Sequence, residues 1–317
     1  MYYLNVTTVR DSTPSRIISI NKQILTMRIL NRFRFYKSIL TKDMDSWARH
    51  GYAKFNELNS LLQPYTGELK NKVILDVGCG QMYAQSLLLH NSKNNVVGID
   101  SAPIVVNGRN IMLYLNLLRH GDLQYLARAI LYQLLLKNRS YYRTLRELSG
   151  LPLTNSGLDI RRMNVEEMSF DDNVFDIAIS LAVFEHILDV PKAISELYRV
   201  LKPNGVTYIN IHLFRSLSGG HHPDYLDQNK VPPWDHLREN RCKFPIYLNK
   251  YTEHEYISMF ATKFQILEVI NVGVGEGSDF LTPKIQAEFS SYSKEELLKR
   301  GITIIARKPL STTSLTI

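Results

Sequence analysis

The chain has 317 residues, of which 44% are hydrophobic and 21% charged, and its formal net charge at pH 7 is +8. That length can bury one large core or two small ones, and two cysteines are too few for a disulfide framework, which favours a reduced, cytoplasmic setting. No apolar run approaches the roughly 18 residues of a membrane span, and the first residues lack the charged-then-apolar order of a secretory signal.

The positive charge is concentrated in two segments. Residues 1–42 carry a net charge of +7 and residues 107–150 one of +5, so the rest of the chain is net negative. This distribution argues against a broad basic face that grips nucleic acid. It leaves contact between a membrane surface and either basic segment open as an alternative.

The beginning of the chain differs in character from the remainder. Residues 1–45 are interpreted as a basic leader that is partly disordered. Over 46–68 the spacing of aromatic residues predicts a helix that ends near Pro64 and Gly67. Residues 46–310 are predicted to form the folded domain, and 311–317 a tail.

After residue 72, short apolar runs alternate with helical patterns. The runs predicted as strands are 73–77, 95–99, 159–163, 175–180, 206–211, 264–272 and 302–307. Strands that alternate with helices predict an α/β fold with a doubly wound, seven-stranded, mainly parallel sheet and helices on both faces.

Capping signals predict where several helices begin. Asp189, followed by Pro191, predicts a helix start, and the proline–glycine sequence at 202–205 predicts the end of that helix. A further helix is predicted over 81–89. Capping boxes, in which Ser or Thr precedes Glu by three residues, predict two more starts, at Thr252 with Glu255 and at Ser293 with Glu296.

Residues 107–157 make the connection after the second predicted strand much longer than a crossover requires. Apolar residues at helical spacing from Leu123 to Leu135 predict an amphipathic helix within a helical insertion. We interpret the insertion as a segment that packs on the domain and forms a lid over a cofactor and acceptor pocket. A dimer face and a membrane contact are the alternatives.

The first predicted strand runs into a glycine-containing turn. Gly78 and Gly80 let a ligand approach the backbone without a Cβ in the way. Asp100 ends the second predicted strand 20 residues after Gly80, where an acid can accept hydrogen bonds from ribose hydroxyls. Tyr83 stands where a dinucleotide site has its third glycine, which disfavours a nicotinamide dehydrogenase. The pattern therefore indicates another adenosine-bearing cofactor.

The ordered motifs resemble those of a known family. The segments LDVGCG, VVGIDSAP, FDDNVFDIAISLAVFEHI and ELYRVLKPNGVTYI occur in the family's order within residues 73–213. This part of the chain resembles class I S-adenosylmethionine-dependent methyltransferases of the small-molecule type, related to the ubiquinone and menaquinone methyltransferases. The resemblance implies a Rossmann-like methyltransferase fold with S-adenosyl-L-methionine as cofactor.

The resemblance also implies roles for the residues of the glycine turn. Gly78, Cys79 and Gly80 would contact the methionine and adenosine portions of the cofactor through their backbone. Asp76 would steady the turn or meet the amino group through water. Met82 stands where the family usually has a further glycine, which puts the shape of the methionine end of the pocket in doubt.

Later strands would supply the remaining cofactor contacts. The resemblance implies that Asp100 and Ser101 lie at the ribose, and that Asn164 and Val165 face adenine. The family often has Asp where Asn164 stands, so the hydrogen-bond pattern there is open. The residues implied for the floor near the sulfonium are Ser180 and Leu181.

The long connection at 212–250 is rich in Gly and Pro, as functional loops often are. If the acceptor is a hydroxyl, His221 or His222 is predicted to be its general base, with Asp224 orienting the imidazole. Solvated loop histidines are the alternative, and His186 is a second candidate for the base. No metal site is predicted, because no further ligand spacing accompanies the two histidines.

We therefore predict a methyltransferase that acts on a small-molecule acceptor at oxygen, of the sugar, phenolic, quinone-like or lipid-linked class. Trp234 and Arg238 would position a ring or an acidic group of that acceptor, with burial of Trp234 in the loop core as the alternative. An RNA methyltransferase and a non-catalytic, methyltransferase-shaped partner subunit are the other interpretations. The oligomeric state is left open.

Overall fold

The computed structural model describes residues 43–102, 115, 117–119, 121–134, 137–238 and 246–310. The predicted tail, nearly all of the predicted leader and part of the predicted insertion therefore lie outside the described residues. Among the described helices, none combines the length and the apolar character that crossing a bilayer requires.

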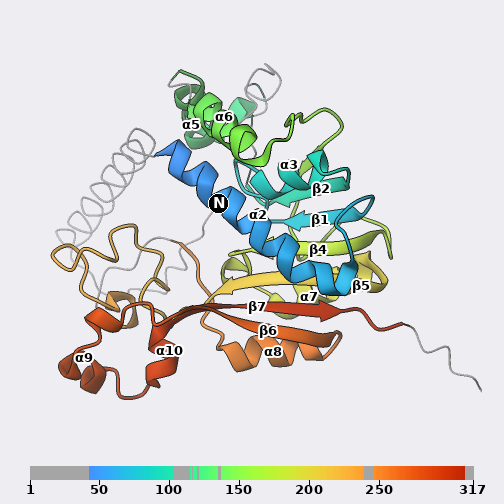
Figure 1. The fold of residues 1–317 in the computed structure, drawn as a ribbon. Helices are drawn as coiled ribbons and strands as arrows, with labels where there is room; N and C mark the ends of the chain where they lie inside the picture. The colour runs from blue at the N-terminus through green and yellow to red at the C-terminus, as the bar shows by residue number, and fades with distance from the viewer. Residues whose placement is uncertain are drawn as a thin grey trace, which may run out of the picture.

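A seven-stranded sheet in the order β3-β2-β1-β4-β5-β7-β6 forms the centre of the molecule (Figure 1). Its strands β1 to β5 are parallel, and β7 runs antiparallel to both β5 and β6. The predicted mainly parallel sheet is confirmed. The strands are β1 Val73–Val77, β2 Asn95–Asp100, β3 Asp159–Arg162, β4 Phe175–Leu181, β5 Leu201–His212, β6 Gln265–Val274 and β7 Lys299–Arg307.

Helices cover both faces of the sheet, so neighbouring residues of a buried strand enter different cores. In β1, Ile74 packs in one apolar cluster and Leu75 in the other. The first cluster includes side chains of α2 (Met44–Thr66), α3 (Ala84–Asn91) and α6 (Lys137–Ser149). The second includes α7 and α8, and Figure 1 shows α2 crossing the sheet. The remaining described helices are α5 Leu123–Leu134, α7 Val190–Val200, α8 Glu253–Ala261, α9 Pro283–Glu288, α10 Lys294–Leu298 and the 3₁₀ turns η1 Phe184–His186, η2 Asp235–Leu237 and η3 Ser278–Phe280.

The predicted helix starts are confirmed by their caps. The side chain of Asp189 accepts from the backbone of Lys192 at the start of α7, and both predicted capping boxes are formed, at α8 and α10. Two boundaries differ from the prediction. Helix α3 begins only at Ala84, because Tyr83 adopts a left-handed backbone with φ +32°. The 202–205 turn lies within β5 as an irregularity of its pairing with β4, because α7 already ends at Val200.

The second half of the predicted insertion is packed on the domain. At the start of α2, Asp45 Oδ1 accepts hydrogen bonds from Ser140 at 2.6 Å and from Thr144 at 2.7 Å, both on α6. The predicted apolar stripe of α5 is only partly covered, since Leu123 and Ile130 are exposed. Packing of the insertion is thus observed for α6, and its role as a lid stays a prediction.

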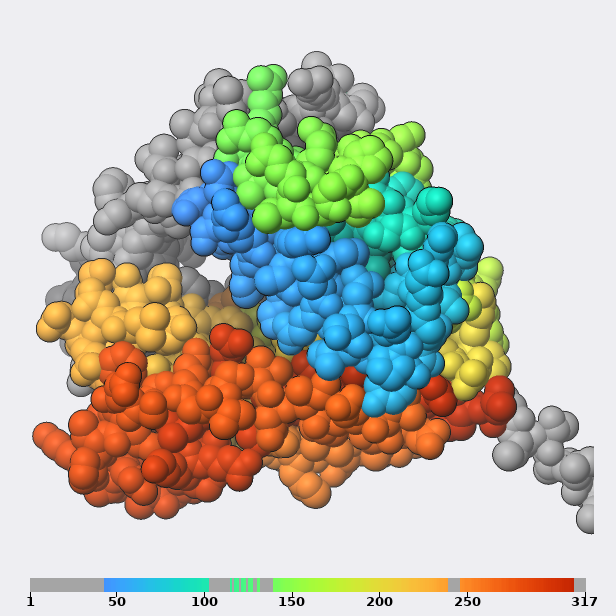
Figure 2. All heavy atoms as spheres, in the orientation of Figure 1, coloured from blue at the N-terminus to red at the C-terminus, as the bar shows by residue number. Residues whose placement is uncertain are grey.

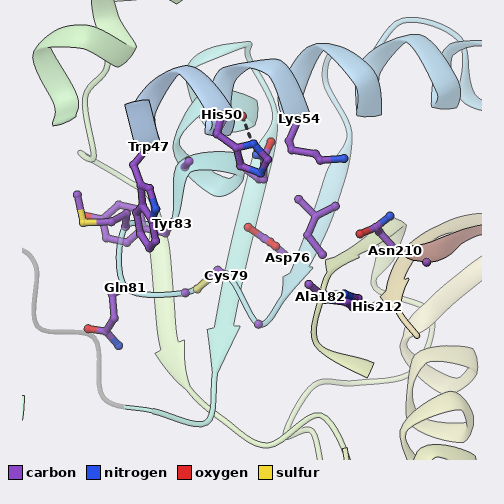
Figure 3. Close-up of a pocket in the computed structure, with 18 of the residues that line it drawn as sticks. Trp47, His50, Lys54, Asp76, Cys79, Gln81, Tyr83, Ala182, Asn210 and His212 are labelled. Carbon is purple, nitrogen blue, oxygen red and sulfur yellow. Dashed lines mark hydrogen bonds between the residues drawn. The ribbon is translucent and has the colours of Figure 1, made fainter. Parts of the chain in front are cut away.

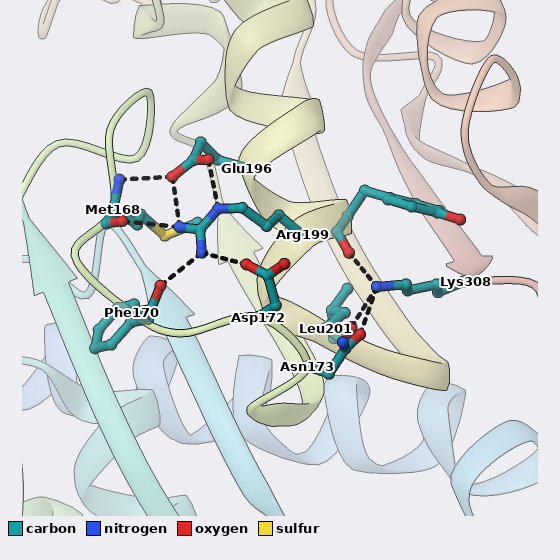
Figure 4. Close-up of polar contacts among 9 residues, drawn as sticks. Met168, Phe170, Asp172, Asn173, Glu196, Arg199, Leu201 and Lys308 are labelled. Atoms are coloured by element: carbon teal, nitrogen blue, oxygen red, sulfur yellow. Dashed lines mark hydrogen bonds and ion pairs between the residues drawn. The ribbon is translucent and has the colours of Figure 1, made fainter. Parts of the chain in front are cut away.

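An arginine holds the segment after β3 against α7 (Figure 4). Arg199 donates hydrogen bonds to the backbone oxygens of Met168 at 2.8 Å and Phe170 at 2.6 Å. It also donates to the carboxylates of Glu196 and Asp172, each at 2.9 Å. These charge-assisted bonds fix the backbone that leads from the end of β3 to β4.

Candidate active site

The loop after β1 satisfies its own backbone donors. The N–H groups of Gly78 and Cys79 both donate to the carbonyl oxygen of Ile99, at 2.8 and 3.0 Å. The N–H of Gly80 donates to Asp100 Oδ2 at 3.0 Å. Asp100 therefore faces the glycine turn, as the sequence predicts. Because these three N–H groups are already used, a ligand would contact the backbone of the loop through its carbonyl oxygens and Cα hydrogens. Of the predicted backbone contacts, those that need an N–H donor are therefore not available.

Glycine is required at position 78 and at position 80 for different structural reasons. Both have φ +69°, a conformation that favours glycine. A Cβ on Gly78 would lie 2.2 Å from Val183 Cγ2, whereas a Cβ on Gly80 would meet nothing within 4 Å. The prediction that both glycines make room for a ligand therefore applies only to Gly80. At Gly78 a neighbouring side chain takes that room.

Two cavities adjoin at this loop. One, of about 730 Å³, lies beyond the ends of β1, β2 and β3, and the other, of about 490 Å³, lies under α2. Gly78, Leu181 and Ala182 line both cavities. They meet at the carboxyl ends of β1 and β4, where the strand order reverses and open α/β sheets bind their ligands.

The larger cavity brings together four of the predicted cofactor residues: Asp100, Ser101, Asn164 and Val165. Asn164 is held by Glu166, to which its side chain donates at 3.2 Å and from whose backbone it accepts at 3.1 Å. This pairing turns the amide of Asn164 toward its own loop, so its predicted contact with adenine stays a prediction.

One residue predicted for the floor of the pocket is misplaced. Ser180 is buried within the sheet, where its hydroxyl donates to the backbone oxygen of Val77 at 3.2 Å, and it lines neither cavity. Leu181, the next residue, lines both. The reason is the alternation of side chains along a strand, which sends neighbouring residues to opposite faces.

Asp76 lies at the wall of the smaller cavity and is buried. Burial raises its pKa to about 6, although the hydroxyl of Ser86, which donates to its Oδ2 at 2.5 Å, acts in the opposite direction. Burial likewise raises the pKa of the Cys79 thiol, which is therefore not a nucleophile. These groups support the shape of the loop.

The first turns of α2 form one wall of the smaller cavity (Figure 3). Trp47, His50, Gly51 and Lys54 line it from one face of the helix, and burial lowers the pKa of His50. Figure 2 shows the surface hollowed between these turns and the loop after β5. These residues were not predicted from the sequence. Their spacing of three, four and seven positions was the available signal, because it marks one helix face.

The other walls combine aromatic and polar groups. Figure 3 shows Tyr83 beside Trp47 at one side of the cavity, with Asn210 and His212 at the opposite side beyond Asp76. Tyr141 of α6 and Arg300 of β7 complete the wall. No ion pair joins Arg300 to another of the described residues.

The predicted orienting acid, Asp224, lies beside a lysine. Its carboxylate is 3.2 Å from Lys230 Nζ, and its backbone N–H donates to His222 Nδ1 at 3.1 Å. The carboxylate beside His221 is instead that of Glu185, whose Oε1 lies 3.9 Å from His221 Nε2. Asp224 is close to His221 in the sequence, but the carboxylate that lies beside His221 in the structure is that of Glu185.

Glu185, His186, His212 and His221 form a compact group, called here the imidazole–carboxylate cluster. The His221 ring lies 4.9 Å from that of His186 and 4.7 Å from that of His212. Burial lowers the pKa of His212 to about 3 and that of His221 to about 4, and it raises the pKa of Glu185 to about 8. At neutral pH the imidazoles are therefore uncharged and each keeps a lone pair.

His186 and His212 connect this cluster to the two cavities. His186 lines the larger cavity, its Nδ1 lies 3.0 Å from the backbone oxygen of Tyr247, and burial lowers its pKa. His212 lines the smaller one. His221 and His222, the predicted bases, line neither cavity, so their catalytic role stays a prediction that needs His212 or His186 as an intermediary.

Two further predicted acceptor residues serve the loop itself. Trp234 is buried in a separate apolar cluster with Leu217 and Phe289. Arg238 donates to both carboxylate oxygens of Glu288, at 2.7 and 2.9 Å. Neither lines the two cavities, so the alternative interpretation of Trp234 as loop core is correct.

Comparison with protein families matches residues 119–209 to the model described as "Methyltransferase domain". The matched segment contains β3, β4, α7 and most of β5, and it ends before the acceptor loop. The match supports the methyltransferase family and does not distinguish the ubiquinone and menaquinone type within it.

Individual proteins resemble the chain only over short stretches or distantly. The tRNA U34 carboxymethyltransferase of Shewanella loihica is 44% identical over 43 residues, which are 14% of this chain and 13% of that protein. An S-adenosylmethionine-dependent methyltransferase from Mesorhizobium loti is 15% identical with a TM-score of 0.45, covering 78% of this chain and 96% of that one. Geranyl diphosphate C-methyltransferase from Streptomyces coelicolor is 14% identical with a TM-score of 0.45, covering 80% and 76%.

The residues of the cleft fit S-adenosylmethionine. Asp100 lines the larger cavity and Gly80 the smaller one, and the hydrogen bond from the Gly80 N–H to the Asp100 carboxylate joins the two walls. Three observations are consistent with a methyltransferase domain. They are the antiparallel strand β7, the acid Asp100 at the end of β2, and the family match. Residues 119–209 of the chain match the methyltransferase domain family, and the sheet order and the position of Asp100 are compatible with that match.

Proposed function

We propose that this enzyme methylates an oxygen atom of a small molecule held in the cavity of about 490 Å³ under α2. The lining of that cavity carries the proposal. Trp47 and Tyr83 lie side by side in the wall (Figure 3), and Tyr141 also lines the cavity. Arg300, which forms no ion pair among the described residues, is a further lining residue. A ring-bearing acceptor with an acidic or carbonyl group matches this lining.

The chain's residues divide the work of binding. Asp100 and Ser101 would bind the ribose and Val165 the adenine of S-adenosylmethionine, which supplies an electrophilic methyl group when bound; all three line the larger cavity, which supports this assignment. The backbone carbonyl groups of Gly78 and Cys79 would receive the ammonium group, since the N–H groups there already donate to Ile99. The smaller cavity is left for the acceptor.

A hydroxyl acceptor must give up its proton as the new C–O bond forms. His212 is placed to receive it, because it lines the acceptor cavity and burial lowers its pKa to about 3, which keeps the imidazole neutral. Glu185 and His221 lie behind it, and burial raises the pKa of Glu185 to about 8. A proton taken up at His212 can therefore be shared within the imidazole–carboxylate cluster before it reaches solvent.

The proposal is tested with the full chain, S-adenosylmethionine and a panel of phenolic, quinol-like and sugar acceptors, each with and without a carboxylate. Release of S-adenosylhomocysteine is measured. Arg300→Met should raise the KM of the anionic acceptors by about tenfold, since a charge-assisted hydrogen bond contributes on the order of 1.5–3 kcal/mol. The control is Arg146→Met, which removes an exposed arginine of α6.

Three outcomes speak against the proposal. Unchanged KM values in Arg300→Met would remove the arginine from the acceptor site. Absence of turnover with every small molecule would reject the acceptor class. Methylation of tRNA, the substrate class of the protein matched over 43 residues, with a rate that falls steeply with salt would establish an RNA methyltransferase instead.

A further inference from the structure

Three side chains from separate parts of the chain converge at His212, which lines the smaller cavity. Glu185 comes from the turn after β4, His212 from the last position of β5 and His221 from the loop that follows. One ligand atom from each lies within 4.8 Å of the others. Because β4 and β5 are parallel neighbours, their carboxyl ends bring the first two together.

The carboxylate of Glu185 lacks a side-chain partner. The side chain is 2% exposed, and both carboxylate oxygens are buried without a hydrogen bond of normal geometry, although the backbone amides of Glu185 and His212 act on the carboxylate and lower its pKa against the effect of burial. His221 Nε2, 3.9 Å from Glu185 Oε1, is likewise buried and unpaired. A buried carboxylate is unfavourable unless a cation or several donors satisfy it, and no Lys or Arg among the described residues forms an ion pair with it. Two unpaired polar groups therefore face one another across a gap.

The hydrogen bonds of His212 leave one ring nitrogen available. Its Nε2 lies 2.8 Å from Ser218 Oγ, and that hydroxyl donates its single hydrogen to Glu276 Oε2 at 2.8 Å. Ser218 must then accept from His212, which places the proton on Nε2 and the lone pair on Nδ1. Metal-binding histidines are commonly held in this way, with the other ring N–H donated to a polar neighbour.

We infer that Glu185, His212 and His221 form a binding site for one divalent transition-metal ion. Two imidazole nitrogens and one carboxylate oxygen are a donor set that suits zinc, iron(II) or cobalt(II) better than magnesium or calcium, which prefer oxygen. Ligands of one such ion lie roughly 3.3 Å apart, so side-chain rotation of about an ångström closes the site.

The position of the site suggests a use, which rests on the proposed function. His212 lines the acceptor cavity, so an ion beside it would contact an acceptor hydroxyl there. Coordination lowers the pKa of a hydroxyl. With the ion bound, the lone pair of His212 would be occupied, so the proton of the acceptor O–H bond would pass to solvent instead of to His212. The oxygen would then attack the methyl carbon as the carbon–sulfur bond breaks. Metal binding itself does not depend on this step.

The test uses the full chain without added histidines, stripped of metal by a chelator and titrated with Co²⁺ and with Zn²⁺. Calorimetry should show one ion per chain, and bound Co²⁺ should give visible absorption of a four- or five-coordinate ion. Glu185→Gln and His221→Asn should each weaken binding by at least about 100-fold, and Ser218→Ala by about 10–100-fold. His254→Asn, an exposed histidine of α8, is the control and should leave binding unchanged.

The possible results separate the metal site from its catalytic use and from the proposed function. No saturable binding by the wild-type chain overturns the site, as does equal affinity in Glu185→Gln and the control. Thermal unfolding shows whether each variant is folded, and glutamine keeps the shape of the glutamate. If the ion binds but a chelator leaves methyl transfer unchanged, the catalytic use is rejected and the site stands. If the ion binds and no small molecule is methylated, the proposed function fails independently.

Discussion

The two glycines after β1 provide a sharp test of the loop geometry. They share φ +69°, yet alanine should be tolerated very differently at the two positions. At Gly80 the new Cβ meets nothing within 4 Å, so the cost is that of a left-handed backbone, about 1–2 kcal/mol. At Gly78 the Cβ would lie 2.2 Å from Val183 Cγ2, which adds an overpacking cost of about 1–3 kcal/mol.

Gly78→Ala should therefore lower the free energy of unfolding by about 2–5 kcal/mol in total. Urea denaturation of the ligand-free chain measures this quantity for both alanine variants. Because the added clash is with the branched end of Val183, the Gly78→Ala/Val183→Ala double variant should recover about 1–2 kcal/mol relative to the sum of the single effects. Val183→Ala alone is the control.

The reasoning is refuted if Gly78→Ala and Gly80→Ala cost the same, or if the double variant is additive. Calorimetry with S-adenosylmethionine adds a second measure. The Cβ at position 80 enters the open space beside Asp100, so Gly80→Ala should weaken cofactor binding by about tenfold or more while costing less stability.

Three further predictions concern single groups. Asp100→Asn should weaken S-adenosylmethionine binding by about 10–100-fold in calorimetry, because a neutral amide accepts less well from ribose hydroxyls; an unchanged Kd would contradict the assignment. Burial raises the pKa of Glu185 to about 8, so the folded chain holds this proton where the unfolded chain has lost it, and stability is lost as pH rises. Urea denaturation of the metal-free wild type and of Glu185→Gln measures this effect. The free energy of unfolding of the wild type, relative to the variant, should fall by about 3 kcal/mol between about pH 5 and about pH 8. A difference that does not change with pH would show that the carboxylate is solvated. Arg199→Met should lower the free energy of unfolding by about 2–4 kcal/mol, because two backbone oxygens and two carboxylates lose their donor, and a loss below about 1 kcal/mol would show that the cluster is dispensable.

Local signals in the sequence predicted the frame of this fold well. The strands that carry the cleft were found because a strand buried on both faces reads as a short apolar run, and Asp189 and Thr252 marked helix starts through their caps. The placement of Asp100 opposite Gly80 was also predictable, because the ends of adjacent parallel strands must meet. What these signals share is that each is set by neighbours in sequence or by one strand pairing.

The acceptor side was less predictable for a physical reason. The spacing of Trp47, His50 and Lys54 marks a helix face but does not say what that face meets. Glu185 finds His221 only because a turn after β4 and a loop after β5 close on each other, a contact with no local signature. The prediction of Asp224 as the orienting acid relied on nearness in sequence, which irregular loops do not preserve.

The cleft is built from two kinds of material. Its cofactor side consists of strand ends and the turn between β1 and α3, tied to the sheet by the bonds to Ile99 and Asp100. The side proposed for the acceptor is lined by side chains of α2 and α6, and hydrogen bonds to Asp45 join these two helices. On the proposed function, substitutions on those two helices would change which molecule is accepted while the strand ends and the turn after β1 keep their shape, so that a new substrate preference could evolve without a change in the methyl-transfer site.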